Sequence, residues 1–267
     1  MEILVCIKQV PDDSVEVHLT DEGKPDLTNI TPVVNAFDTY ALEMAARLKE
    51  AGEGEITALC IGGEEARNSL KNCLAVGADH AYLVREDQFD GSDSMGISHI
   101  LMCAAKKIEE DTGKKFDLIF CGKEATDAAL GQVGVSLAEM MGTGAVTNVI
   151  EVCCAEGCVT AKQETEEGYR MIETKVPCVL TVTKPDYDPR YPTIKNKMAA
   201  RKKPIGTIKA EDLAMLEPEK TGAAGAFART LKLYEPPKKE AGVKILEETA
   251  EDSALKAVAL MADAKVF

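Results

Sequence analysis

Short apolar runs alternate with amphipathic stretches along the first half of the chain. The strand-like runs are rich in Val, Ile, Leu and Phe and cover residues 3–10, 55–61, 81–84 and 116–121. The stretches with apolar side chains at helical spacing cover residues 37–51, 64–76, 93–112 and 129–141. Strands that alternate with helices of this length connect by right-handed crossovers and form a parallel sheet. The pattern therefore predicts an α/β domain.

Two segments depart from this alternation. Residues 15–28 contain the run VEVHL and the polar turn DEGKPD, which together predict a hairpin at the edge of the sheet before the first helix. From residue 146 to residue 182, four strand-like runs follow one another without intervening helices. These runs predict an antiparallel extension of the sheet.

The last third of the chain changes character again. Beyond Thr183, prolines and charged residues become frequent, and such a segment cannot build a core of its own. Within it, Leu255, Val258 and Met261 form an apolar stripe on a helix predicted at 251–264, which needs a partner surface. We therefore expect a doubly wound, mainly parallel sheet with an antiparallel extension and an extended C-terminal arm. The expected divisions are residues 1–183, 184–204 and 205–267.

Charge and composition narrow the classes of protein. The 45 acidic and 31 basic residues give a net charge of -14, which disfavours binding to nucleic-acid backbones and anionic membranes. No apolar stretch reaches the roughly 18 residues of a membrane helix, and the first residues lack the layout of a signal peptide. Nine cysteines without a paired framework indicate buried thiols in a reducing compartment. We expect a cytoplasmic protein with no nucleic-acid partner and no membrane insertion.

Ligands of open parallel sheets bind at the carboxyl ends of the strands, near a topological switch point. The segments at these ends are 8–11, 35–38, 61–63 and 122–134. The last, GKEATDAALGQVG, is the richest, because its small residues and helix-start amides suit a phosphate or pyrophosphate. It matches neither the GxGxxG fingerprint nor a Walker A loop, so an ordinary strand-to-helix loop is the alternative interpretation.

No catalytic side chain is apparent. The three histidines are dispersed over a predicted hairpin, a loop and a helix, which predicts no histidine-based metal site or triad. Cys154 and Cys158 lack the second ligand pair that zinc requires, so we interpret them as structural. Asp38 and Asp127 lie near predicted helix starts, where capping is the simpler role. The absence of a nucleophile with a nearby base indicates binding and electron transfer through a cofactor.

Four segments of the chain resemble the β subunit of electron transfer flavoprotein. They are VCIKQVPD, VNAFDTYALEMAARLKE, CGKEATDAALGQVG and KPDYDPRYPTIKNKMAARKKPI, in the order and at the approximate spacings of that family. The family's signature region is recognisable as AKQETEEGYRMIETKVPCVLT. One departure is Arg170, where an acidic or amide residue is usual. Together these segments anchor nearly the whole chain.

The resemblance implies an α/β nucleotide-binding fold that pairs with a larger α subunit carrying its own FAD. For the β subunit it implies a second nucleotide, either FAD or a structural AMP. The cofactor-binding residues implied in this way lie at the strand ends: Cys6, Asn35, Ala36, Phe37, Asp38, Ile61, Gly122, Lys123, Glu124, Ala125, Thr126, Asp127, Ala128, Ala129, Leu130, Gly131, Gln132 and Val133. Backbone groups would hold the adenine and ribose, and the amides near Gly131, Gln132 and Val133 would face phosphate.

The end of the 122–134 loop bears on the choice between FAD and AMP. AMP-binding members of the mitochondrial type carry Gln-Thr-Gly, whereas this chain carries Gln132-Val133-Gly134. That variant resembles members from anaerobes that hold FAD and bifurcate the electrons of NADH. The resemblance implies that one electron goes to ferredoxin or flavodoxin and the other, through the α-subunit FAD, to an acyl-CoA dehydrogenase. No side chain of the chain need act as a catalytic base.

The Pro-rich segment 184–204 resembles the loop with which the family recognises the dehydrogenase. The docking residues expected from this resemblance are Tyr191, Ile194, Lys195 and Met198, an apolar centre with a basic rim. By the same resemblance, residues 205–267 form an arm that packs on the α subunit and covers the stripe of the last helix. A solvated basic linker is the alternative interpretation of 184–204.

Three further interpretations stay open. Within the family, the chain could be a non-bifurcating subunit that holds structural AMP and carries electrons from an acyl-CoA dehydrogenase. From another class, it could be an adenine-nucleotide hydrolase-like protein, although it lacks the N-terminal Ser-Gly-Gly type of loop of such enzymes. It could also be a nucleotide-sensing module without redox chemistry, stable alone or as a homodimer.

Overall fold

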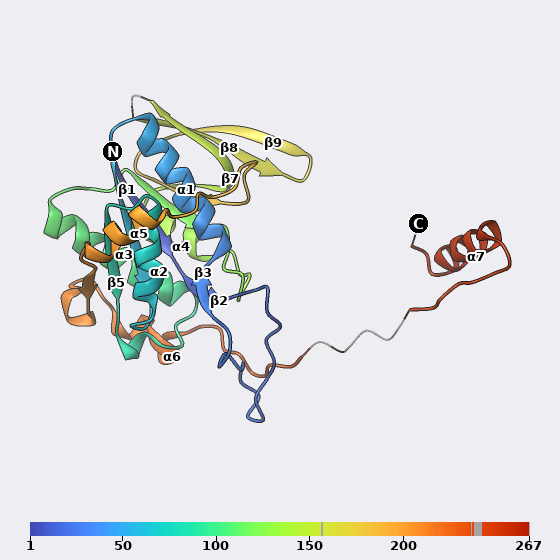
Figure 1. The fold of residues 1–267 in the computed structure, drawn as a ribbon. Coiled ribbons are helices and arrows are strands. Elements are labelled where there is room, and N and C mark those ends of the chain that lie inside the picture. The colour runs from blue at the N-terminus through green and yellow to red at the C-terminus, as the bar shows by residue number, and fades with distance from the viewer. Residues whose placement is uncertain (156, 236, 238–241, 267) are drawn as a thin grey trace.

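Residues 1–155, 157–235, 237 and 242–266 are described by a computed structural model of the chain. Within these residues, nine strands form one sheet in the order β11-β5-β4-β1-β6-β10-β7-β8-β9 (Figure 1). A separate antiparallel pair joins β2 (Gln9–Pro11) to β3 (Pro32–Val34).

The sheet is mostly parallel. Its parallel strands are β11 (Gly206–Ile208), β5 (His80–Val84), β4 (Glu55–Ile61), β1 (Glu2–Ile7), β6 (Leu118–Gly122), β10 (Cys178–Val182) and β7 (Gly144–Ala155). The strands β8 (Cys158–Thr165) and β9 (Gly168–Lys175) continue it in antiparallel fashion. The central strands are buried on both faces, and this burial explains why β1, β4 and β10 are nearly continuous apolar runs.

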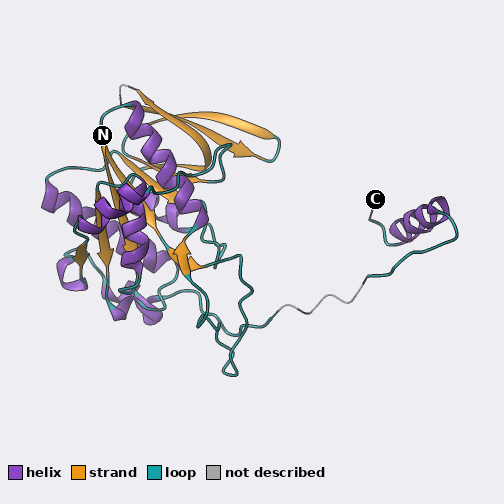
Figure 2. Ribbon diagram, viewed as in Figure 1, coloured by secondary structure: helices purple, strands orange, loops and turns teal. Residues whose placement is uncertain are grey.

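Helices cover both faces of the sheet (Figure 2). They are α1 (Ala36–Ala51), α2 (Ala66–Val76), α3 (Ser94–Thr112), α4 (Val133–Met141) and α5 (Ile194–Lys202). Ile3, Val5 and Ile7 of β1 share one core with α1, α2 and α5, whereas Leu4 and Cys6 share the other with α3 and α4. Successive side chains of a strand point to opposite faces, so one strand serves both cores. The predicted doubly wound sheet with an antiparallel extension is confirmed.

Three details differ from the sequence-based predictions. The run 178–182, expected in the antiparallel extension, instead forms β10, which is fully buried between β6 and β7 and parallel to both. The hairpin predicted at 15–28 is a turn with one antiparallel bridge between Leu19 and Pro25, because its mostly exposed side chains gain little from strand pairing. The helix predicted from residue 129 begins at Val133, since Ala129 and Gly131 have positive φ angles.

The chain after α5 returns to the sheet. There β11 pairs with β5, and Ile208 and Leu213 are buried in the core of α3 and α4. The remaining short elements are η1 (Asp87–Phe89), η2 (Ala210–Asp212), η3 (Pro218–Lys220) and α6 (Gly222–Gly225). The last helix, α7 (Ala250–Asp263), lies apart from the sheet in Figure 1 and buries none of its residues. Among the helices described, none has the length and hydropathy that a membrane span needs.

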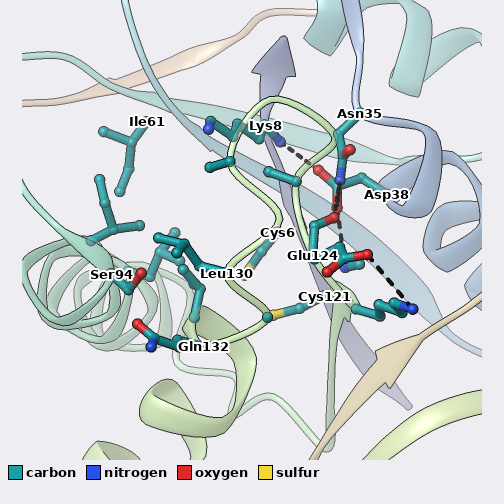
Figure 3. A pocket seen from close by; sticks show the side chains of 18 of the residues that line it. Cys6, Lys8, Asn35, Asp38, Ile61, Ser94, Cys121, Glu124, Leu130 and Gln132 are labelled. Carbon is teal, nitrogen blue, oxygen red and sulfur yellow. Dashed lines mark hydrogen bonds and ion pairs between the residues drawn. The ribbon is translucent and has the colours of Figure 1, made fainter. Parts of the chain in front are cut away.

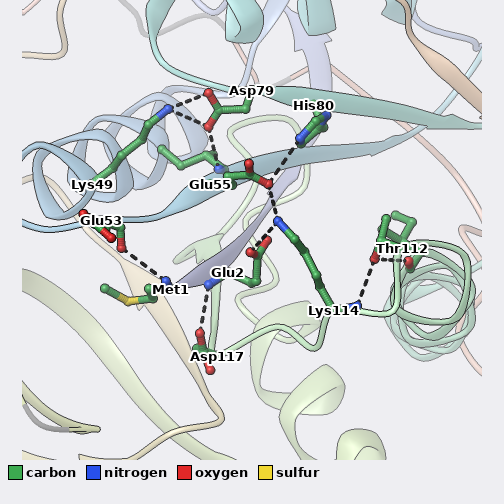
Figure 4. A network of polar contacts seen from close by, with 12 residues as sticks. Met1, Glu2, Lys49, Glu53, Glu55, Asp79, His80, Thr112, Lys114 and Asp117 are labelled. Atoms are coloured by element: carbon green, nitrogen blue, oxygen red, sulfur yellow. Dashed lines mark hydrogen bonds and ion pairs between the residues drawn. The ribbon is translucent and has the colours of Figure 1, made fainter.

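Polar contacts close the edge of the sheet where the parallel strands begin (Figure 4). Lys114 contacts Glu2 at the start of β1 at 2.9 Å and Glu55 at the start of β4 at 2.6 Å. Asp117, which precedes β6, accepts a hydrogen bond of 2.8 Å from the backbone N–H of Glu2. Because these side chains occupy the amino ends of the strands, a ligand is expected at the opposite, carboxyl edge.

Candidate nucleotide site

A cavity of about 260 Å³ opens at the carboxyl ends of β1, β4 and β6 (Figure 3). From β1 the chain passes through α1 to β4 on one side, and from β6 it passes through α4 to β7 on the other. The direction of the winding therefore switches between β1 and β6. Ligands of open α/β sheets bind in the crevice outside such a switch point.

The cavity brings together most of the residues expected to bind a cofactor. Those that line it are Cys6, Asn35, Asp38, Ile61, Gly122, Lys123, Glu124, Ala125, Ala128, Leu130, Gly131, Gln132 and Val133. Those outside its lining are Ala36, Phe37, Thr126, Asp127 and Ala129. The first two lie in the opening turn of α1, and the other three belong to the loop 122–134.

Contacts with the rest of the sheet edge hold this loop in place. Thr126 donates its backbone N–H to Oδ1 of Asn35 at 3.0 Å, and Nδ2 of Asn35 donates to the carbonyl of Glu124 at 2.9 Å. Asp127 forms an ion pair with Lys8, whose Nζ lies 2.6 Å from Oδ1 of Asp127. Asp127 lies in the loop before α4 rather than at its start, so the capping role expected for it is wrong.

Asp38 fastens the strand ends beneath the cavity. Its carboxylate accepts hydrogen bonds from the N–H of Lys8 at 2.7 Å, from Nδ2 of Asn35 at 2.9 Å and from the N–H of Gly122 at 3.0 Å. Lys8 directly follows β1, Asn35 directly precedes α1, and Gly122 is the last residue of β6. Asp38 therefore joins three elements, which goes beyond the helix-start role expected for it.

The same burial changes the protonation of Asp38. Desolvation raises the pKa of its carboxyl to about 7, and the hydrogen bonds from Lys8, Asn35 and Gly122 oppose this shift without cancelling it. A carboxyl with this pKa exchanges its proton near neutral pH. The polar floor of the site is therefore sensitive to pH in the physiological range.

Two thiols form the apolar part of the floor. Cys6 at the end of β1 and Cys121 in β6 are both buried and line the cavity (Figure 3). A hydrogen bond with Cys121, together with burial, raises the pKa of Cys6 well above its usual value. Because the thiolate is the reactive form, Cys6 acts here as a small neutral surface and not as a nucleophile.

The start of α4 supplies donors for an anion. The side chain of its N-cap residue, Gln132, makes no capping hydrogen bond, and Gln132 and Val133 line the cavity. The first amides of a helix have no partner within the helix, so they are available to a ligand at this end. Gly134 allows α4 to approach the sheet, since a Cβ there would lie 2.5 Å from Cγ2 of Thr181. Open amides at the positive end of a helix bind phosphate groups.

One further wall of the cavity was not predicted from the sequence. It is formed by the start of α3, where Ser92, Asp93, Ser94, Ile97 and Leu101 line the cavity. A sequence signal exists, because Ser92, Asp93 and Ser94 lie at the start of the helix predicted at 93–112, the first helix after the strand predicted at 81–84. The chain after residues 81–84 returns to the carboxyl edge of the sheet at the start of α3, which is where ligands of such sheets bind.

The four expected docking residues lie elsewhere, on and beside α5. Ile194 begins this helix and is 81% exposed, Met198 is exposed one turn later, and Lys195 is exposed between them. Tyr191, just before the helix, is 91% exposed. These side chains therefore form a surface group that is separate from the cavity.

Comparisons with known proteins bear on the whole chain. A family model described as electron transfer flavoprotein domain matches residues 29–213. The chain is 35% identical to the electron transfer flavoprotein subunit beta of Megasphaera elsdenii, over 96% of this chain and 95% of that protein. It is 34% identical to subunit CarD of the caffeyl-CoA reductase-Etf complex of Acetobacterium woodii, over 95% of each chain. It is 32% identical to the acryloyl-CoA reductase electron transfer subunit gamma of Anaerotignum propionicum, over 92% of each.

These matches agree with the fold and with the four sequence segments. The family model covers more than half of the chain, and the relatives are matched along nearly their full lengths. The chain therefore belongs to the electron transfer flavoprotein family, as a relative of its β subunits.

Proposed function

We propose that this chain pairs with an electron transfer flavoprotein α subunit and binds FAD in the cavity at the sheet edge. In the heterodimer it passes electrons between NADH, an acyl-CoA dehydrogenase and a low-potential acceptor, ferredoxin or flavodoxin. The observation that carries this proposal is the cavity itself, which lies at a topological switch point and is lined by the N-terminus of α4.

Two features support FAD over AMP. The residue between Gln132 and Gly134 is Val133, which lines the cavity and offers no hydroxyl group to a terminal phosphate. Two similar proteins are, by name, a subunit of a caffeyl-CoA reductase-Etf complex and the electron transfer subunit gamma of an acryloyl-CoA reductase, and electron transfer favours a redox-active nucleotide. Structural AMP in a non-bifurcating subunit is the second candidate.

The residues of the chain would bind and orient the nucleotide. The amides of α4 would hold phosphate, and Cys6, Ile61 and Leu130 would provide apolar contact with the base and sugar. The cavity of about 260 Å³ is small for a ligand site, so we expect it to hold the adenine nucleotide part. When bound, the flavin supplies the redox chemistry, since it takes up a pair of electrons and releases them singly.

Acid release and chromatography of the nucleotides in the purified heterodimer test the cofactor. We expect two FAD and no AMP per heterodimer, together with NADH oxidation that depends on both ferredoxin and the dehydrogenase. One FAD and one AMP would contradict the bifurcating function and support the structural role of the β-site nucleotide. A chain that is stable and nucleotide-loaded without an α subunit would contradict the heterodimer.

The exposed group on α5 is proposed to dock the dehydrogenase. Replacing Ile194→Ala removes an apolar anchor that is 81% exposed, so the KM for the dehydrogenase should rise while nucleotide content stays unchanged. Met215→Ala is the control, because Met215 is also exposed but lies outside α5. Equal KM values for wild type and Ile194→Ala would refute the docking role.

A further inference from the structure

The docking segment, residues 184–204, is joined to the domain by an ion pair between Arg190 and the buried carboxylate of Glu43. Glu43 lies in the middle of α1, and its side chain is 3% exposed. Its carboxylate accepts hydrogen bonds from the backbone N–H of Arg190 at 3.1 Å and from Nε of Arg190 at 2.7 Å. Nη2 of Arg190 adds a third bond at 3.2 Å. A guanidinium that meets a carboxylate through several parallel bonds fixes direction as well as distance.

Neighbouring contacts hold the chain before Arg190 along α1. Glu50, further along the same helix, accepts a second set of bonds from the guanidinium of Arg190. The guanidinium carbon of Arg47 lies 3.7 Å from the centre of the half-buried ring of Tyr187. Burial alone would raise the pKa of Glu43, but the bonds from Arg190 and Arg47 hold it below its usual value. The carboxylate is therefore charged and paired at neutral pH.

The far end of the docking segment is held as well. Nζ of Lys71 in α2 donates to the carbonyls of Ala200 at 3.1 Å and Arg201 at 3.2 Å, in the last turn of α5. At the start of α5, Oγ1 of Thr193 accepts the N–H of Asn196 at 3.1 Å. The exposed docking residues therefore lie between two fixed ends.

We propose that the contact between Arg190 and Glu43 is the device that holds the docking surface in its partner-ready arrangement. Arg190 is then a positioning residue for electron transfer to an acyl-CoA dehydrogenase. This inference rests on the proposed function, in which Tyr191, Ile194 and Met198 contact that partner. Tyr191 follows Arg190 directly, so the guanidinium fixes the point from which the exposed apolar group projects. A surface that is ordered in advance loses less freedom on binding.

The structure also separates positioning from folding. In an Arg190→Gln variant, Glu43 keeps its bond of 2.7 Å to Nε of Arg47, so the buried carboxylate retains a cationic partner. The cavity lies at the edge of β1, β4 and β6 and shares no lining residue with this contact. We therefore expect the variant to fold and to keep its nucleotide.

Steady-state electron transfer of the purified heterodimer tests the inference, with a purified acyl-CoA dehydrogenase that works with the wild type. Arg190→Gln should raise the KM for the dehydrogenase about tenfold, with kcat and nucleotide content little changed. Arg190→Lys should restore part of the loss, because an ammonium keeps the charge but not the paired geometry. Arg85→Gln is the matched control, since Arg85 forms a surface ion pair of 2.7 Å with Glu64 outside the docking segment.

A double variant distinguishes the inference from the docking proposal. If Arg190 acts through the exposed group, Arg190→Gln adds little to the effect of Ile194→Ala. A raised KM for Ile194→Ala with a normal KM for Arg190→Gln would overturn the positioning role and leave docking intact. Normal KM values for both variants would overturn docking and positioning together. A fall in kcat and nucleotide content with unchanged KM would also overturn the inference, because it would indicate a general structural defect.

Discussion

At the scale of single residues, the buried carboxylate of Asp38 connects β1, α1 and β6 through hydrogen bonds. Its carboxylate accepts one hydrogen bond from nearby Asn35 and two from Lys8 and Gly122, which lie 30 and 84 residues away in the sequence. The cost of this position is the loss of solvation, which raises its pKa to about 7. The same group therefore links the geometry of the cavity floor to pH.

The raised pKa predicts a specific pH dependence of stability. In the unfolded chain Asp38 releases its proton near 3.8, but in the folded chain it does so near 7. Between these values the folded state binds more protons, so this group's contribution to stability falls as the pH rises, by on the order of 4 kcal/mol in total. Asp38→Asn cannot titrate. The thermal midpoint of the wild-type heterodimer should therefore decrease relative to that of Asp38→Asn between pH 5 and pH 8, and a constant difference would contradict this account.

Two glycines of the cavity are expected to tolerate an added methyl group to different degrees. A Cβ at Gly122 would lie 2.3 Å from Oδ1 of Asp38 and 3.0 Å from its backbone N. Neither atom can move without breaking the hydrogen bonds that the Asp38 carboxylate accepts. Gly122→Ala should cost about 1–3 kcal/mol and lower nucleotide content. Gly131 has space, with its nearest atom at 3.6 Å, but a φ of +63°, so Gly131→Ala should cost only about 1 kcal/mol. Thermal midpoints and nucleotide content measure both, and equal losses in the two variants would be inconsistent with these contacts.

At the scale of elements, the start of α3 serves both the cavity and the C-terminal tail through Asp93. Oδ1 of Asp93 caps the helix by accepting the N–H of Gly96 at 3.0 Å. Oδ2 accepts the N–H of Phe227 at 2.7 Å and of Ala228 at 3.2 Å. One carboxylate thus satisfies the amides of a helix end and of a segment more than a hundred residues away.

Substitution of Asp93 by Asn or by Ala should separate its role as a helix cap from its contact with the C-terminal tail. Asp93→Asn keeps an oxygen for the helix cap but presents an amide nitrogen to Phe227 and Ala228, so the tail after α6 should become more susceptible to limited proteolysis. Asp93→Ala also removes the cap and should cost about 1 kcal/mol more in the free energy of unfolding. Proteolysis time courses and thermal midpoints provide the measurements. Identical behaviour of the two variants would argue against separate roles.

At the scale of the whole molecule, α7 presents an apolar face without cover from the sheet. This face consists of Leu255, Val258 and Met261, whose side chains are 64%, 53% and 43% exposed. Thr249 caps the N-terminus of the helix. A lone amphipathic helix of this length is marginally stable in water. A stable α7 therefore needs a protein surface that covers its apolar face, and we propose that the α subunit provides this surface.

A double replacement on this face tests that proposal. Leu255→Ser with Met261→Ser should remove about 2–4 kcal/mol of apolar burial in a complex and reduce co-purification of a tagged α subunit. Glu251→Gln with Asp252→Asn, on the first turn of the same helix, is the control and should leave the complex intact. Unchanged recovery of the α subunit with the apolar variant would exclude α7 from the interface.

The local pattern was sufficient for most elements, because the periods of two and 3.6 depend on neighbouring residues alone. It located α1, α3 and β4 closely and placed the loop 122–134 at a strand end. It misjudged β10, which is an apolar run that could pair in either direction, and its parallel place between β6 and β7 depends on the whole sheet. It also extended α4 back over Ala129 and Gly131, whose left-handed φ angles serve the loop.

By itself, the sequence determined the alternation of strands and helices, the positions of the strand ends and the segments that resemble the family. The tertiary structure alone decided which strand ends meet, that α3 forms a wall of the cavity, and that Arg190 meets Glu43 across 147 residues. The physical reason is that periodicity and capping act between neighbours in the chain. Contacts such as those of Asp38 and Arg190 arise only when distant segments share one desolvated site.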